Sequence, residues 1–242
     1  MTAPRYAIYF VPAPTHPLHR LGSALLGYDC YDGTEPPPPT GAGLPEDWPA
    51  LTEEPRRYGF HATLKAPFRL AQGGDETALR EAVRRLAHAQ PDIPRIRPVV
   101  RTIGSFVAVV PAERVPALDR LAADCVTRLD RFRAPLTAED RRRRQGALTT
   151  ERLRENFESW GYPWVFESFR FHMTLTGPLP ADRRDGLADH LAGLVARHLG
   201  PGPLAIDRIA LLKQPEPQAR FRVIAAADLP TQAAVGPALP RP

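Results

Sequence analysis

The stretch HATLKAP at residues 61–67 returns as HMTLTGP at residues 172–178. Histidine, threonine, leucine and proline hold the same places in both copies, and a phenylalanine precedes each histidine. Polar and apolar side chains alternate through both copies, and successive side chains of a β-strand point to opposite faces. We therefore predict two strands that bury phenylalanine and leucine on one face. The opposite face would present His61, Thr63 and Lys65 in the first copy, and Arg170, His172 and Thr174 in the second.

The segments that follow the two motifs repeat in the same order. An amphipathic helical pattern comes first, and two short runs with strand character come after it. These segments are 75–90, 93–103 and 106–110 after the first motif, and 181–199, 204–212 and 220–224 after the second. The chain is thus predicted to contain two strand-helix-strand-strand units, which is an internal duplication.

Duplicated units usually pack about an approximate two-fold axis. This symmetry predicts an α+β fold in which antiparallel sheets face a central cleft and the two histidines converge. We expect a single bilobal domain over residues 1–242, with a first motif lobe at about 58–111, a helical bridge at about 115–160 and a second motif lobe at about 165–226. The proline-containing tail 229–242 is expected to be flexible.

The remaining segments surround these units. We predict a first strand at 5–11, a short helix at 17–26, and bridging helices at 115–131 and 137–160, the latter with Thr149 as a candidate cap. Tyr6 and Tyr9 point to opposite faces of the first strand, so at most one of them faces the cleft. Residues 28–56 are rich in proline, glycine and acidic residues and are expected to form a long loop, serving as a lid or rim.

The composition is typical of a soluble globular protein. Of 242 residues, 43% are hydrophobic and 24% are charged, and the formal net charge is +5. This charge favours anionic partners but is modest for a dedicated nucleic-acid binder. Arg141–Arg144 form one dense basic run. It indicates either a solvated helix face beside Glu139 and Asp140 or a patch that contacts phosphate.

Cysteine usage and the absence of targeting signals predict a cytoplasmic protein. Cys30 and Cys125 lie far apart and in no metal-binding or redox spacing, so we expect reduced thiols. The first residues contain no charged segment followed by an apolar one, and no apolar run is long enough to cross a bilayer. No membrane partner is therefore expected.

Several motifs of other enzyme classes are absent from the sequence. There is no H-E-x-x-H, no cysteine cluster and no carboxylate within the paired motifs, so neither a metal nor another cofactor is expected. There is also no P-loop and no G-x-S-x-G motif. Two imidazoles, each with a hydroxyl two residues further on, are the main chemical signal.

The paired H-x-T motifs in a duplicated α+β chain resemble the 2H phosphoesterase superfamily, which includes RNA 2′,3′-cyclic phosphodiesterases and RNA-ligase-like proteins. A closer resemblance is to a phosphonate-metabolism branch, whose genes often neighbour carbon–phosphorus lyase genes. It lies in RYAIY at 5–9, PRRYGFHATLK at 55–65, GYP at 161–163 and FRFHMTLTG at 169–177, and extends over about 5–226. The resemblance implies a bilobal fold with a central cleft and metal-independent chemistry on cyclic phosphodiesters.

Carried over by motif position, the resemblance implies that His61 and His172 are the catalytic pair and that Thr63 and Thr174 bind the phosphate. The chemistry agrees, because water opens a cyclic phosphate with the help of one base and one acid. Histidine, with an unperturbed pKa of ~6.5, suits both roles, and each transfer is typically worth ~10²–10⁴-fold in rate. The threonine hydroxyls can donate to the non-bridging oxygens. Which histidine is the base stays open.

Four further residues are candidates for contacts with the rest of the substrate. Lys65 and Arg170 flank the histidines on the predicted polar faces, where they either add positive charge or are simply solvated. Arg56 and Tyr58 precede the first motif and either hold a second anionic group or a sugar, or pack against the loop.

These observations predict a phosphoric diester hydrolase. The reaction would be metal-independent hydrolysis of a cyclic phosphodiester of a small phosphorylated sugar or nucleotide, linked through the resemblance to phosphonate metabolism. One alternative is an RNA 2′,3′-cyclic phosphodiesterase that acts on RNA ends, which the basic run mildly favours. A second alternative is a non-catalytic module that binds a nucleotide or an RNA end.

Overall fold

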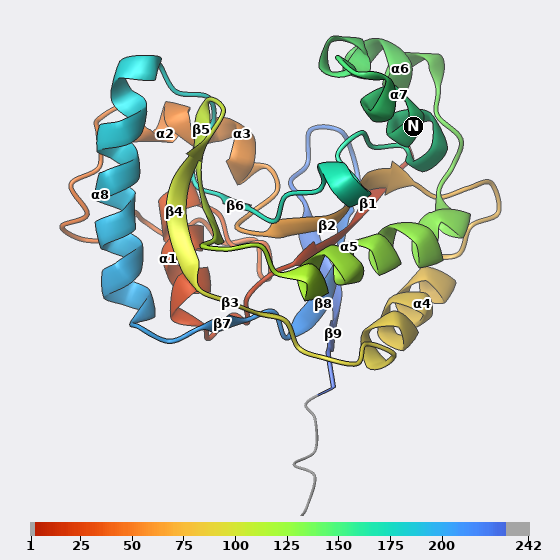
Figure 1. Cartoon of the computed structure of the whole chain (residues 1–242), viewed down its shortest axis with the longest axis horizontal. Helices are drawn as coiled ribbons and strands as arrows, with labels where there is room; N and C mark the ends of the chain where they lie inside the picture. Colours follow the sequence, from red (N-terminus) through yellow and green to blue (C-terminus); the bar gives the residue numbers. More distant parts are fainter. Residues whose placement is uncertain (1–2, 231–242) are drawn as a thin grey trace, which may run out of the picture.

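A seven-stranded antiparallel sheet runs through the molecule (Figure 1). The computed structural model describes residues 3–230. The strand order is β4-β5-β6-β2-β1-β8-β9, and a separate two-stranded sheet pairs β3 with β7. The strands are β1 (Arg5–Phe10), β2 (Ala62–Arg69), β3 (Arg95–Ile96), β4 (Pro98–Ile103), β5 (Phe106–Pro111), β6 (Met173–Thr174), β7 (Leu204–Ala205), β8 (Arg208–Gln214) and β9 (Arg222–Asp228). The predicted α+β class with antiparallel pairing is confirmed.

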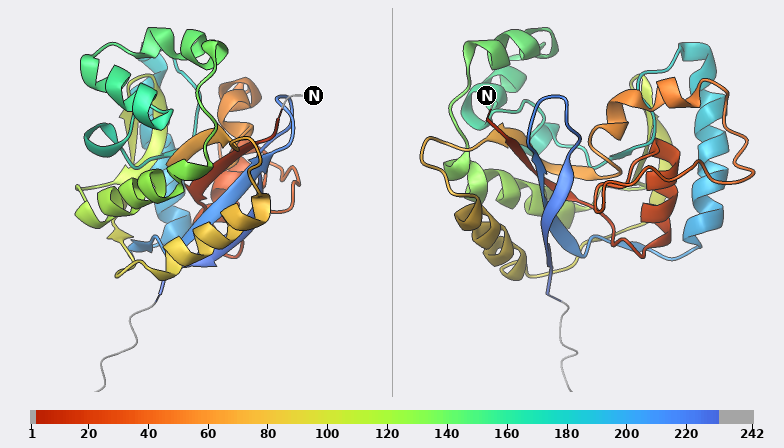
Figure 2. Two further views of the ribbon diagram at one scale, coloured as in Figure 1. Left: turned by 90° about the vertical axis from the view of Figure 1, so that its right-hand side faces the viewer. Right: turned by 180° about the vertical axis from the view of Figure 1, so that it is seen from behind.

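The helices gather in three groups around the sheet (Figure 2). Helix α8 packs beside α1, α4 packs beside α5, and α6 and α7 lie together away from both. The helices are α1 (Pro17–Leu26), α2 (Trp48–Leu51), α3 (Glu53–Arg56), α4 (Glu76–His88), α5 (Pro116–Leu129), α6 (Ala138–Arg144), α7 (Glu151–Trp160) and α8 (Ala181–Leu199). Within residues 3–230, no helix has both the length and the apolar character that crossing a membrane requires.

Local sequence explains where α4 begins and which face it buries. The carboxylate of Asp75 accepts hydrogen bonds from the backbone N–H groups of Thr77 and Ala78, which would otherwise have no partner in the first turn. Apolar residues recur at helical spacing, and Leu79 and Val83 are buried in the main core. The helix therefore packs this face against β8 and β9.

The two repeated units are intertwined. Their element orders are β2-α4-β3-β4-β5 and β6-α8-β7-β8-β9. The hairpin β4–β5 of the first unit extends the sheet beside β6 of the second, while β8–β9 of the second unit reaches β2 through β1. In the same way α4 packs on β8 and β9, and α8 packs on β4 and β5. Each unit thus buries its helix against the strands of the other.

The predicted arrangement of two sheets that face a central cleft is not confirmed, because both motif strands belong to the same sheet. Strands β2 and β6 are hydrogen-bonded neighbours in one sheet, paired through Ala62 and Met173. The sheet changes direction around the short strand β6: β4 and β5 stand upright in Figure 1, whereas β2 runs nearly horizontally. A single sharply turned sheet replaces the expected pair of facing sheets, because each hairpin pairs with the opposite unit.

The segment 28–56 is more ordered in secondary structure than a plain loop. It contains α2 and α3, and the side chain of Trp48 is buried. Its indole Nε1 donates a hydrogen bond to the carbonyl of Leu25 at 2.7 Å, which attaches the segment to the end of α1. The predicted loop is therefore wrong over 48–56.

The helical bridge also differs from the prediction. The helix predicted at 137–160 is two helices, because α6 ends at Arg144 and α7 starts after a 3-10 turn, capped by Thr150 rather than Thr149. In the tail, Leu229 is buried and its backbone N–H donates to the carbonyl of Asp207. Residues 231–242 lie outside the part of the chain that the structure describes.

Strand β1 separates two apolar clusters. Tyr6, Ile8 and Phe10 enter the main core, which also holds Ala62 and Met173. The opposite face sends Ala7, Tyr9 and Val11 into a smaller cluster with Tyr28, Cys30 and Phe221. Because side chains alternate along a strand, the motif histidines lie on the face of the smaller cluster.

Candidate active site

The pairing of Ala62 with Met173 brings the two H-x-T motifs together. In an antiparallel pair this register sets His61 across from Thr174, and Thr63 across from His172. All four side chains line one cavity of about 340 Å³. Each imidazole therefore lies opposite the hydroxyl of the other motif, in the same hollow of the protein.

The wall of this two-histidine cavity is largely aromatic. Five aromatic side chains other than the histidines line it, and they come from β1, β5 and the segments before β2 and β6: Tyr9, Tyr58, Phe106, Tyr162 and Trp164. Glu54 and Arg144 supply the remaining charged side chains of the wall. Such a hollow can hold a small ligand with an apolar ring and a single anionic group.

Both histidines are held by the same backbone contact. Nδ1 of His61 donates to the carbonyl of Gly59 at 2.8 Å, and Nδ1 of His172 donates to the carbonyl of Arg170 at 2.7 Å. A carbonyl oxygen can only accept, so the proton of the neutral ring is on Nδ1. Nε2 is then the basic nitrogen of each ring, and in His61 it lies 3.3 Å from the hydroxyl of Thr63.

Burial favours the neutral form of both imidazoles. It lowers the pKa of His61 from 6.5 to about 4, against a smaller raising effect from the Gly59 carbonyl, and the nearby His172 lowers it further. Burial also lowers the pKa of His172, while the Arg170 carbonyl acts to raise it. At neutral pH both rings are therefore uncharged, and an anion bound between them would raise both pKa values.

Lys65 does not lie in the two-histidine cavity. Between Thr63 and Lys65 the pairing with β1 shifts register, since these residues pair with the consecutive Tyr9 and Ile8. The irregularity turns Lys65 away from its predicted face. Its ammonium is buried under α5, where it donates to Asp130 at 2.9 Å and to a backbone carbonyl. The prediction that Lys65 shares a face with His61 is wrong.

Arg56 is committed to contacts within the protein. Its guanidinium donates to the carbonyls of Leu26 and Pro49 and to the hydroxyl of Thr52. These bonds hold the segment of α2 and α3 against the end of α1. The two-histidine cavity does not include Arg56 among its lining residues.

Tyr58 and Arg170 lie closer to the histidines. The ring of Tyr58 stacks on Phe221 at 5.3 Å, is 6.0 Å from the His61 ring, and lines the two-histidine cavity. Arg170 is exposed and lines an adjoining, larger cavity of about 790 Å³, which shares Thr63 and His172 with the first. Both remain candidates for substrate contacts.

The sequence interpretation overlooked several wall residues. Tyr162 belongs to the GYP stretch that supported the family resemblance, so its motif was a usable signal. Alternation along β1 allows only one of Tyr6 and Tyr9 to face the cavity, and in the structure it is Tyr9. Arg144 belongs to the basic run, which was one signal for a phosphate contact. No comparable signal exists for Phe106 or Trp164, since they reach the cavity only through long-range folding.

Neither the cysteines nor a carboxylate cluster adds a reactive centre. Burial raises the pKa of Cys30 to about 12 and raises that of Cys125 further, so both thiols stay protonated. Within residues 3–230 no three histidine, cysteine, aspartate or glutamate side chains gather as metal ligands would.

An α+β fold with two imidazoles and two threonine hydroxyls in one cavity defines a protein with the groups for acid–base chemistry. The chain belongs to the family described as "Protein of unknown function (DUF1045)", whose profile matches residues 63–222. That match includes Thr63 and the whole of the second motif.

Two relatives carry the name "Ribose 1,5-bisphosphate phosphokinase PhnN". The protein from Janthinobacterium sp. (strain Marseille) is 37% identical over 228 residues, which cover 90% of this chain and 49% of the relative. The protein from Laribacter hongkongensis (strain HLHK9) is 34% identical over 223 residues, which cover 90% and 50%. The chain thus spans about half the length of the curated relatives it matches.

Proposed function

We propose that the protein hydrolyses a cyclic phosphodiester of a small phosphorylated sugar or nucleotide by two-histidine acid–base catalysis, without a metal. The observation that carries the proposal is the register of Ala62 and Met173, which gathers both H-x-T motifs in one cavity. The repeated carbonyl contact, which leaves Nε2 of each ring as the basic nitrogen, adds to its support.

In the proposed reaction, water attacks phosphorus while Nε2 of one histidine takes its proton. The ring P–O bond breaks, and the leaving oxygen takes a proton from Nε2 of the other histidine, so a phosphomonoester is formed and the protons balance. The hydroxyls of Thr63 and Thr174 donate to the non-bridging oxygens, where negative charge grows.

We assign the base to His61 and the acid to His172. Burial lowers the pKa of His61 to about 4, which favours an unprotonated ring. The pKa of His172 is lowered as well, but the bound phosphodiester anion raises it and favours the imidazolium that an acid requires.

The names of the relatives point to the substrate. A kinase acting on ribose 1,5-bisphosphate needs a supply of that compound, and these relatives are about twice as long as the matched part. The present chain contains no P-loop sequence. Hydrolysis of 5-phosphoribosyl 1,2-cyclic phosphate at the bond between phosphorus and O2 yields ribose 1,5-bisphosphate. This substrate also agrees with the phosphonate-metabolism resemblance and is our first choice.

The test is turnover in EDTA by the purified protein. The substrates are 5-phosphoribosyl 1,2-cyclic phosphate, 2′,3′-cyclic mononucleotides, and RNA ending in a 2′,3′-cyclic phosphate, with the products identified by ³¹P NMR. We expect metal-free formation of ribose 1,5-bisphosphate, abolished in both His61→Gln and His172→Gln. ATP-dependent consumption of ribose 1,5-bisphosphate, with no cyclic-phosphate turnover, would instead assign the kinase activity to this chain.

One observation favours RNA ends as a second candidate substrate. The larger cavity beside His172 is lined by Phe166, Phe169 and Trp164, whose rings can stack on bases. An RNA enzyme would prefer longer oligonucleotides and lose affinity steeply with salt. Tight binding without turnover, unchanged in His61→Gln, would indicate the non-catalytic module.

A further inference from the structure

A second cavity, of about 290 Å³, adjoins the two-histidine cavity and is rich in arginine. Five guanidinium groups line it, from β1, the end of β2 and the segment between α5 and α7: Arg5, Arg69, Arg133, Arg143 and Arg144. Asp140 is the carboxylate in its wall. We call this hollow the arginine cavity.

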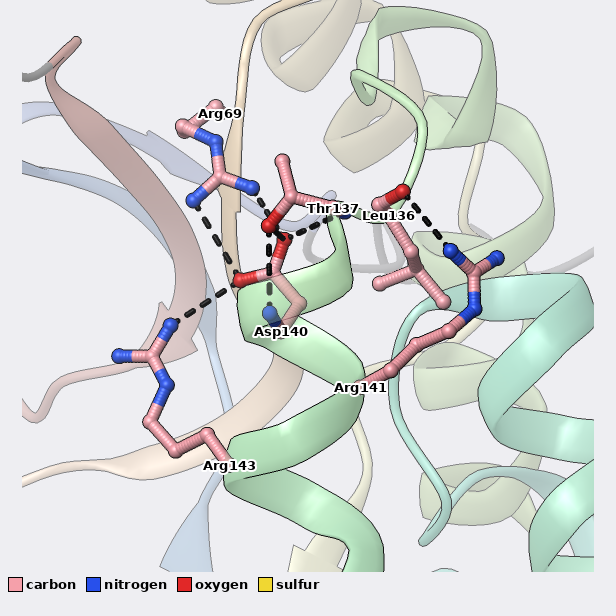
Figure 3. A network of polar contacts seen from close by, with 6 residues as sticks. All are labelled: Arg69, Leu136, Thr137, Asp140, Arg141 and Arg143. Carbon is pink, nitrogen blue, oxygen red and sulfur yellow. Dashed lines mark hydrogen bonds and ion pairs between the residues drawn. The ribbon is translucent and has the colours of Figure 1, made fainter.

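Helix α6 is fixed over the arginine cavity by one carboxylate. Figure 3 shows Asp140 accepting from Arg69 of β2 and from Arg143, while Thr137 completes a capping box at the start of the helix. Burial acts to raise the pKa of Asp140, but the bonds from Arg69 and Thr137 lower it well below its usual range, so it stays charged. The basic run therefore begins on an anchored helix.

Arg141 adds a second anchor to α6 and takes no part in the cavity. It forms an ion pair with Glu158 of α7 and donates to the carbonyl of Leu136. Arg142 is exposed and also absent from the cavity wall. The four consecutive arginines thus divide into two that face away and two, Arg143 and Arg144, that line the cavity.

Positive charge in the arginine cavity exceeds negative charge. Asp140 is shared by Arg69 and Arg143, and Arg133 is paired with Asp130. Among residues 3–230, neither Arg5 nor Arg144 forms an ion pair: Arg5 donates to the neutral Gln214, and Arg144 lies over the rings of Tyr162 and Trp164. Two guanidinium groups are thus available to an anion.

The two cavities adjoin and share part of their lining. Tyr58, Ala66, Pro67, Arg144 and Tyr162 line both of them. Arg144 lies at the boundary between the two cavities. It lines both, and its guanidinium lies over the ring of Trp164, which lines the two-histidine cavity but not the arginine cavity. A small ligand can therefore place one group between the histidines and another among the arginines.

We propose that the arginine cavity binds a second, non-reacting phosphoryl group of the substrate, and so selects phosphorylated sugars over plain cyclic phosphates. The inference rests on the proposed hydrolysis at the two histidines. A terminal phosphomonoester, with two negative charges and three acceptor oxygens, matches several convergent guanidinium forks better than a singly charged diester does. Arg5 would act at the terminal phosphate together with Arg143, whose guanidinium gives one donor to Asp140 and keeps others for an anion, and Arg144 would act between the two groups.

The first test compares two substrates that differ only in that phosphate: ribose 1,2-cyclic phosphate with and without a 5-phosphate. In Arg5→Gln and Arg143→Gln we expect KM for the 5-phosphorylated compound to rise by about tenfold or more, because a charge-assisted contact is lost. KM for the compound without the 5-phosphate should stay unchanged. Arg142→Gln, from the same helix, is the matched control and should leave both values unchanged.

Equal losses on both substrates, or no loss on either, would overturn the proposal. A second measurement separates it from the hydrolysis itself. Ribose 5-phosphate, titrated calorimetrically, should bind wild type and His61→Gln alike, and Arg5→Gln and Arg143→Gln about tenfold or more weakly. Binding of this kind without any cyclic-phosphate turnover would support the anion site and reject only the hydrolysis. No binding to wild type would reject the anion site.

Discussion

The ring of Tyr9 stacks on the imidazole of His61, with centroids 3.8 Å apart and planes 22° from parallel. Tyr9 is buried and comes from β1, the strand next to β2. On the other side of the site, Phe106 of β5 lies 5.6 Å from the ring of His172. Each histidine is therefore held between a backbone carbonyl and an aromatic side chain of the neighbouring strand, which fixes its orientation before a ligand arrives.

Replacing the stacked ring should impair the chemistry. We expect Tyr9→Leu to lower kcat by roughly tenfold or more, because a misplaced imidazole loses much of the value of a positioned base. Tyr9→Phe keeps the ring and should stay close to wild type. The measurement is steady-state turnover at saturating substrate, and equal losses in both variants would show that the hydroxyl, not the stacking, is what the site uses.

The half-buried and desolvated His61 should make the protein less stable in acid. Folding holds the pKa of His61 at about 4 against an ordinary 6.5, so between these values the unfolded chain binds more protons. The free energy of unfolding therefore falls as pH falls from 6.5 to 4, by at most on the order of 3 kcal/mol for this group.

Urea unfolding of wild type and His61→Gln across that pH range measures this contribution. The variant should lose less stability between pH 6.5 and 4 than the wild type does. His88→Gln, which removes an exposed histidine at the end of α4, is the matched control. Parallel curves for wild type and His61→Gln would contradict the assignment of a desolvated, neutral imidazole.

Much of the fold follows from local sequence. The helices predicted at 17–26 and 181–199 coincide with α1 and α8. A helix can be predicted in this way because the spacing of its apolar residues is a local property of the sequence. The alternation around the motifs predicts that each histidine shares a face with its threonine, and the duplication predicts that the two histidines converge. In the structure His61, Thr63, His172 and Thr174 line one cavity.

What the sequence did not predict depends on contacts between distant segments. The exchange of hairpins between the units sets the strand order, and nothing local to β4 or β5 specifies β6 as their neighbour. The register shift that removes Lys65 from the site arises from pairing with β1. The arginine cavity depends on Asp140 binding Arg69, two residues that only the folded chain brings together.

Lys65 should prove structural and not catalytic. Asp130→Ala should destabilise the protein by about 3 kcal/mol, since it leaves the buried ammonium without its carboxylate. Lys65→Met should lower the free energy of unfolding much less. An apolar chain of similar length replaces the ammonium, and Asp130 keeps its ion pair with Arg133. Lys65→Met should not change KM by more than about threefold, given that Lys65 lines neither the two-histidine cavity nor the arginine cavity. A large rise in KM for Lys65→Met with normal stability would instead show that Lys65 contributes to substrate binding.

The two threonine hydroxyls should act on the rate more than on stability. We expect Thr63→Val and Thr174→Val each to lower kcat by about 10²-fold, the usual effect of removing one donor to a developing oxyanion. Thr→Ser at the same positions keeps the hydroxyl and should retain most of the activity. Unfolding in urea should separate this loss from a folding defect, and a valine variant with full kcat would remove that threonine from the mechanism.

Gly59 affects both the packing of the fold and the orientation of the His61 ring. Its φ of 76° lies in the left-handed region, and a Cβ there would approach the Cβ of Cys30 to 2.6 Å. Its carbonyl is the acceptor that holds the His61 ring. Gly59→Ala should therefore both destabilise the protein and lower turnover, because relieving the clash moves that carbonyl.

Gly73→Ala separates backbone strain from the clash. Gly73 has a φ of 73° but no atom within 4 Å of the added Cβ, so it should show only the conformational cost of about 1–2 kcal/mol. The free energy of unfolding and kcat, measured for both variants, give the comparison. We expect Gly59→Ala to lose more stability than Gly73→Ala and to be the one that loses activity. Equal effects of the two substitutions would mean that Cys30 yields easily and that the Gly59 carbonyl does not control the imidazole.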